Sequence, residues 1–196
     1  MRDERAQRQL ALARRYLFGL QESTESLRRR LENWANRGGR PLADATDPGY
    51  WDITTLYAVA RALASERILA LEGVYPALEG DFQTLVDFFE DKGIELALAS
   101  ALGETMFRYH RLTLAEAALD RDADHFRVLT FSEFRRRYED PDLDLKRSLE
   151  PASKALSELS KQQMNELEGA LNEIVEQLVA VTKVPRHKAP GAVGAN

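Results

Sequence analysis

The sequence contains no cysteine among its 196 residues. This absence excludes disulfide bonds, thiolate zinc sites and cysteine nucleophiles. Proline and glycine are few, with 7 and 11 residues, and aromatic residues make up only 8% of the chain. The β-branched residues that favour strands are thinly scattered, whereas the helix-favouring residues Ala, Leu, Glu and Arg are abundant. The composition therefore predicts a globular all-α fold rather than a disordered or strand-rich chain.

Long apolar runs are also missing. No window approaches the roughly 20 consecutive apolar residues that a membrane-spanning helix needs. After Met1 the chain begins with four charged residues, Arg2 to Arg5, and lacks the apolar stretch of a signal peptide. We therefore expect a cytoplasmic protein, and attachment to a membrane surface stays open.

Heptad repeats mark both ends of the chain. The first, over residues 3–36, places these residues at the a and d positions: Leu10, Ala13, Leu17, Leu20, Thr24, Leu27, Leu31 and Trp34. The second, over 160–183, does the same with Met164, Leu167, Leu171, Ile174, Leu178 and Val181. Residues 1–36 carry a net charge of +3 and residues 160–183 one of −2. Opposite charges favour pairing between the two helices, although dimerisation or a partner helix stays open.

These patterns predict a multi-helix bundle of about seven helices, in which the long N-terminal helix pairs coiled-coil-like with the C-terminal helix. The chain divides into a heptad-patterned helix (1–36), a linker (37–49), a helical body (50–183) and a disordered tail (184–196). Inside the body we expect helices over about 49–72, 82–93, 94–112, 114–121 and 131–139. Capping boxes are predicted at three starts, formed by Thr113 with Glu116, Thr130 with Glu133 and Ser160 with Gln163. Pro141 and Pro151 fit the first turn of a helix better than its interior.

Several kinds of chemistry lack their residues. The aspartate-rich segments that start at Asp120 and Asp140 lack the glycine and the bidentate glutamate of a calcium loop. The three histidines supply at most one of the two Glu-x-x-His pairs of a di-iron bundle, because only His125 follows an acid, Asp122, at that spacing and His187 lies in the tail. No glycine-rich phosphate loop and no Gly-x-Ser-x-Gly elbow is present. We therefore predict no metal, no cofactor and no catalytic residue. An enzyme stays possible, because Glu104, Arg108 and Arg111 share a helix face that could line a cleft.

Arg67 is the most unusual single position. On a helical projection it lies among the apolar residues Leu56, Ala60, Leu63 and Leu71. A guanidinium in such a place needs a partner, because an uncompensated buried charge costs several kcal/mol. One interpretation is a structural arginine that pairs with a carboxylate from another helix. The other is a candidate anion or ligand site in a helical cleft.

The arginines are unevenly distributed. Residues 1–40 hold ten arginines and five acidic residues, while the rest of the chain has a net charge of −10. The N-terminal helix combines this basic charge with a candidate interaction surface made of Leu10, Leu12, Tyr16, Leu17, Phe18 and Leu20. Such a basic amphipathic helix suits a protein partner, self-association or an anionic membrane surface. Nucleic acid is not expected, because acidic residues flank the clusters Arg28 to Arg30 and Arg135 to Arg137.

Three functions follow from these features, in order of preference. The first is a non-enzymatic helical protein-interaction or adaptor module of unknown pathway. The second is a peripheral membrane protein that binds through its basic N-terminal helix. The third is a helical small-ligand binder or enzyme with Arg67 in a cleft.

Overall fold

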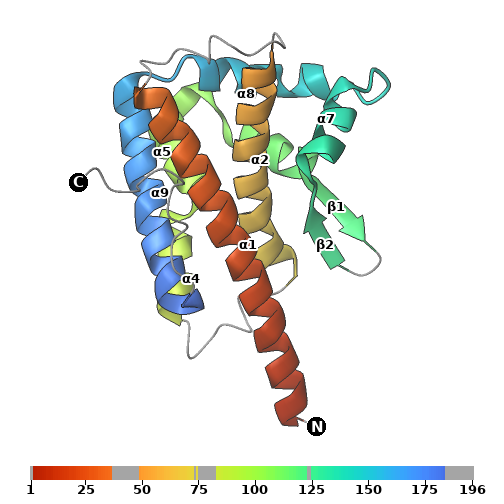
Figure 1. The fold of residues 1–196 in the computed structure, drawn as a ribbon, viewed down its shortest axis with the longest axis vertical. Helices are drawn as coiled ribbons and strands as arrows, with labels where there is room; N and C mark the ends of the chain where they lie inside the picture. The colour runs from red at the N-terminus through yellow and green to blue at the C-terminus, as the bar shows by residue number, and fades with distance from the viewer. Residues whose placement is uncertain (1, 37–48, 73, 75–82, 123–124, 184–196) are drawn as a thin grey trace, which may run out of the picture.

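The computed structural model describes residues 2–36, 49–72, 74, 83–122 and 125–183, with side chains in the first helix from residue 11 onward except that of Leu12. Of the linker expected over 37–49, residues 37–48 lie outside the described residues, and so does the expected tail (184–196). The protein is an all-α multi-helix bundle with one small hairpin (Figure 1). The predicted fold class is therefore confirmed.

The two terminal helices lie side by side. Helix α1 (Arg2–Asn36) runs antiparallel to α9 (Lys161–Thr182), as Figure 1 shows. Thr182 Oγ1 donates to Gln21 Oε1 at 2.6 Å, and Arg28 Nη1 donates to Glu168 Oε1 at 3.3 Å. The described a and d side chains of α1 are all buried, and so are most of those of α9. The predicted pairing of the terminal helices within one chain is therefore confirmed.

Helix α2 (Tyr50–Leu71) is the central element. It packs against α1 on one side and against α6 (Arg108–Ala117), α8 (Leu145–Ser157) and the hairpin on others. Twelve of its residues are buried, and these include the hydroxyl residues Thr54, Thr55 and Ser65. Those hydroxyls donate to carbonyls of their own helix, so their burial leaves no orphaned donor.

Two of the predicted capping boxes begin helices. At the start of α7 (Phe131–Glu139), Glu133 N donates to Thr130 Oγ1 at 3.4 Å. At the start of α9, Gln163 N donates to Ser160 Oγ at 3.2 Å. In return, the Glu133 and Gln163 side chains accept hydrogen bonds from the backbone N–H groups of Thr130 and Ser160. Two backbone amides are thereby satisfied at each helix start.

The helix predicted over 94–112 is interrupted. It follows α4 (Gln83–Lys92), and its first part, α5 (Ile94–Leu102), ends at Gly103, whose φ of 52° is unfavourable for any residue with a Cβ. A 3₁₀ turn (Gly103–Thr105) and the buried Met106 then lead into α6. The prediction of one continuous helix was wrong because α5 and α6 bury their apolar faces against different partners, α9 and α2 respectively.

The helix predicted over 114–121 was also wrong. Thr113 and Glu116 lie inside α6, and an antiparallel hairpin of β1 (Leu119–Asp122) and β2 (His125–Val128) follows. Its charged side chains are tied together, since Asp120 pairs with Arg127 at 2.6 Å and with Arg137 at 3.0 Å. Such tertiary pairing outweighs the local helix preference of the segment.

Pro151 departs from its expected position as well. It lies inside α8, not in its first turn. The residue is exposed, so water can reach the helix carbonyl that proline leaves without a donor.

Candidate functional site

The predicted N-terminal surface is largely used by the fold. Leu17 and Leu20 are fully buried in the core and Tyr16 is half-buried, whereas Phe18 is 42% exposed. The side chains of Leu10 and Leu12 lie outside the described residues. Leu17 and Leu20 must therefore be removed from the candidate interaction surface, because the heptad face that carries them packs inside the bundle.

Arg67 lies at the edge of the interface between α2 and α6, not at its centre. Its side chain is 31% exposed, and its Nη2 donates to Glu116 Oε1 at 3.0 Å. This is the carboxylate from another helix that the structural interpretation requires. Arg67 also lines a cleft of about 390 Å³, the Arg67 cleft, together with Arg108 and Arg111. The sequence singled out all three arginines, but nothing in it indicated that they line one cleft.

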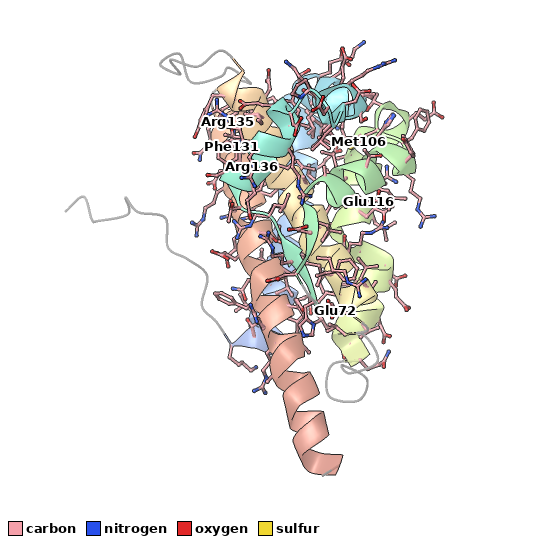
Figure 2. The ribbon with its side chains drawn as sticks, turned by 90° about the vertical axis from the view of Figure 1, so that its right-hand side faces the viewer. Glu72, Met106, Glu116, Phe131, Arg135 and Arg136 are labelled. Carbon is pink, nitrogen blue, oxygen red and sulfur yellow. The ribbon has the colours of Figure 1, made fainter. Side chains whose placement is uncertain are left out.

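A larger hollow lies between α1 and α2, with Phe131 from α7 at its edge. We call it the α1–α2 groove, and its volume is about 680 Å³. Its lining combines charged and aromatic side chains, namely Glu22, Glu25, Arg29, Arg30, Tyr50, Trp51, Tyr57, Arg61 and Phe131. The groove and the Arg67 cleft share no lining residue, so they are separate hollows. Figure 2 shows Phe131 of the groove and Glu116, the partner of Arg67, at different places on the molecule.

Arg30 is the central cation of the α1–α2 groove. Its Nε donates to Thr55 Oγ1 at 2.9 Å, and its Nη2 donates to the Trp51 carbonyl at 3.0 Å and to the Thr54 hydroxyl. The guanidinium carbon lies 4.2 Å from the centre of the Trp51 ring, a cation–π contact. Burial lowers the pKa of the Arg30 guanidinium. No carboxylate of the described residues forms an ion pair with Arg30, so only neutral groups and a ring face its charge.

The other charges of the groove are arranged in pairs. Arg61 Nη2 donates to Glu22 Oε2 at 3.0 Å, linking α2 to α1. The buried Glu25 lies 3.5 Å from Arg29 Nη2 and accepts from Gln21 Nε2 at 2.9 Å. Among the described residues of the lining, three guanidiniums thus face two carboxylates, a balance of one positive charge.

The aromatic side chains give the groove a rigid wall. Tyr57 packs 5.4 Å from Phe131, measured between ring centres, and its hydroxyl donates to the Leu129 carbonyl at 2.9 Å. Trp51 meets the buried Trp34 edge to face at 5.8 Å. Burial also raises the pKa of Tyr57. These contacts fix the rings before any ligand arrives, so little side-chain entropy is lost on binding.

The third charged cluster, around the hairpin, is balanced within itself. Arg127 donates to Glu133 at 2.9 and 3.0 Å and to Asp120 at 2.6 Å. The hydrogen bond from Arg127 lowers the pKa of Glu133 to about 2. Arg137 donates to Asp120 and to the Leu119 carbonyl. Two arginines match two carboxylates, so this cluster holds the hairpin against α7 and has no excess charge for a ligand.

Sequence reasoning missed the α1–α2 groove. Arg30 appeared in it only as part of a charged run, and Trp51, Tyr57 and Phe131 drew no attention as a group. A signal was present, however. Thr54 and Arg61 lie on one polar stripe of α2, and a polar stripe packs against polar side chains of a neighbouring helix. The arginine run near the end of α1 could supply those side chains.

The fold and its hollows define a class, a helical bundle with an aromatic, arginine-lined groove. Comparisons with protein-family models, with curated proteins and with solved structures found no match to this chain. Within the described residues, no helix combines the length and apolar character needed to cross a membrane. Nor do three or more histidine, aspartate or glutamate side chains gather there as a metal site would require.

Proposed function

We propose that the protein is a non-enzymatic interaction module that binds an acidic segment of a partner protein in the α1–α2 groove. The observation that carries the proposal is the environment of Arg30, a half-buried guanidinium with no carboxylate partner among the described residues. A carboxylate of the partner would supply the missing negative charge. Charge-assisted hydrogen bonds to guanidinium are among the strongest that proteins form.

The composition of the groove supports the same function. Tyrosine, tryptophan and arginine dominate the binding energy of protein interfaces because they bury much surface with few rotatable bonds. Tyr50 is 43% exposed at the groove, and Trp51 and Tyr57 are half-buried beside it. A partner with an acidic residue next to an apolar one would match this pattern of charge and rings.

The outer face of α1 extends the proposed surface. The N-terminal part of α1 projects beyond the body of the bundle (Figure 1). On α1, Arg14 and Arg15 are exposed, and Phe18 and then Glu22, which lines the groove, follow them. These residues follow one another at helical spacing, so a partner segment in the groove could continue along the helix.

A library of random 12-residue peptides displayed on phage tests the proposal with the full chain as bait. We expect enrichment of peptides rich in Asp and Glu, and their binding should change the fluorescence of Trp51. Arg61→Glu reverses a groove charge and should weaken binding of a selected peptide at least tenfold. Arg147→Glu is the matched control, since Arg147 is 83% exposed on α8 and lies outside the groove.

Other outcomes would overturn the proposal. Enrichment of neutral or basic peptides would show that the positive charge of the groove does not select the ligand. Binding of a selected peptide by Arg61→Glu as tightly as by the wild type would show the same. Concentration-dependent dimerisation in light scattering that Arg61→Glu abolishes would assign the groove to a second copy. Binding to phosphatidylserine vesicles that Arg14→Glu with Arg15→Glu removes, without peptide binding, would favour the membrane function instead.

A further inference from the structure

The Arg67 cleft has a different chemistry from the α1–α2 groove. Its wall is mainly aliphatic where the groove is aromatic. The aliphatic side chains come from α2, α5 and α6, namely Leu63, Ala70, Leu71, Leu96, Leu112 and Ala115, and α4 adds one aromatic ring, Phe89. Leu71 and Leu96, from α2 and α5, are 43% and 45% exposed. Exposed leucines that meet at one hollow present apolar surface that a ligand can cover.

Arg111 places a buried cation in this cleft. Only 8% of the residue is exposed, and its Nη1 donates to the Met106 carbonyl. Its Nη2 is 3.8 Å from Glu95 Oε1, which is too far for a hydrogen bond. The Nε of Arg111 is buried without a hydrogen-bond acceptor among the described residues. The guanidinium therefore has more donors than the fold satisfies.

Arg108 and Arg111 share a single carboxylate. Glu95 Oε1 lies 3.5 Å from Arg108 Nε and is the same atom that faces Arg111. Arg67 has its own partner in Glu116, which is 63% exposed and lies outside the cleft lining. Both carboxylate oxygens of Glu66 accept from the start of α5, from Ile94 N at 2.8 Å and Glu95 N at 3.0 Å. Glu66 is thus committed to capping, and Glu90 is the remaining acid of the lining.

We infer that the Arg67 cleft binds a small amphiphilic carboxylate, an aliphatic chain that ends in one carboxylate group. The carboxylate would lie among Arg67, Arg108 and Arg111, and the chain would cover Leu71 and Leu96. The volume of about 390 Å³ is at the small end of ligand pockets, which suits a short chain. The inference is independent of partner binding in the α1–α2 groove.

Isothermal titration of the full chain with octanoate, octan-1-ol and acetate tests it. Octanoate should bind, and the other two should bind at least tenfold more weakly, because each lacks either the charge or the chain. Arg67→Gln and Arg108→Gln alter partly or largely exposed side chains, so the fold should tolerate them. Each should weaken octanoate binding roughly tenfold, as expected for the loss of a charge-assisted hydrogen bond.

Arg147→Gln is the matched control and should bind octanoate like the wild type. Leu96→Ser should weaken octanoate binding, while its thermal unfolding temperature should stay within a few degrees of that of the wild type. The inference is overturned if octanoate does not bind, if octan-1-ol or acetate binds equally well, or if both arginine variants keep wild-type affinity.

Discussion

The two faces of α1 show opposite ways of using a helix surface. On the side that faces the core, the heptad positions from Ala13 to Trp34 are filled almost entirely by apolar residues and all are at most 4% exposed. On the groove side, Glu22, Arg29 and Arg30 line the hollow between α1 and α2, where Glu22 pairs with Arg61 and Arg29 with Glu25, while Arg30 has no carboxylate partner among the described residues. The first face stabilises the fold through packing. The second keeps charged groups at a hollow, where they are available to a ligand.

The largest expected effect lies on the packed face. Leu27→Ala removes a side chain that is fully buried on the α1 seam, and it should lower the free energy of unfolding by about 3 kcal/mol. Urea denaturation followed by circular dichroism measures this loss. Ser26→Ala, at the exposed neighbouring position, is the control and should change stability by less than about 0.5 kcal/mol. Equal effects of the two substitutions would contradict the assignment of the two faces.

A comparable effect comes from a half-buried acid that lines the Arg67 cleft, Glu66. Burial raises the pKa of Glu66 from 4.5 to about 7, although its oxygens accept two backbone N–H bonds. Glu66 lies close to the backbone at the start of α5, where a Cβ added to the N-cap residue Gly93 would collide with Glu66 Oε1. Because the pKa is higher in the folded than in the unfolded chain, the protonated form of Glu66 stabilises the fold. That contribution is complete below about pH 4.5 and is lost as the pH rises toward 7.

The difference in pKa corresponds to at most about 3 kcal/mol. Chemical denaturation between pH 4.5 and 8 should therefore show part of the stability falling over this interval. Glu66→Gln cannot ionise, so its unfolding free energy should vary less over the same range. An unchanged pH dependence in this variant would show that Glu66 is not the titrating group.

The smallest effect is expected for the ion pair that joins the terminal helices. Arg28 and Glu168 are 22% and 30% exposed and their nearest atoms are 3.3 Å apart. A double-mutant cycle with Arg28→Gln and Glu168→Gln should give a coupling energy of about 0.5 kcal/mol, and less at 1 M salt. A coupling well above 1 kcal/mol would mean that charge, and not the apolar seam, selects the pairing of α1 with α9.

Local sequence signals predicted a large part of this fold. The heptads at Leu17 to Leu31 and at Met164 to Leu178 identified the two terminal helices and their buried faces. The capping boxes at Thr130 and Ser160 located helix starts to within one residue. Such signals work because a heptad or a cap is encoded within a few turns of one helix.

The candidate sites were much harder to predict. The sequence identified Arg67, but its cleft exists only because the turn at Gly103 redirects α6 toward α2 and brings Arg108 and Arg111 beside it. The α1–α2 groove joins residues separated by about a hundred positions, from Glu22 to Phe131. No repeat or motif links such positions, so spacing alone could not bring them together.

The sequence by itself determined the helical class, the two apolar seams and the helix starts, because these depend on periodicity and on short-range hydrogen bonds. Only the tertiary structure decided which arginines have a carboxylate partner of their own. Among the residues that the structure describes, the guanidinium of Arg30 has no carboxylate partner and that of Arg111 shares Glu95 with Arg108, because of how α1, α2, α5 and α6 are rotated against one another. Those rotations are set by the packing of the whole core, and a single helix does not encode them.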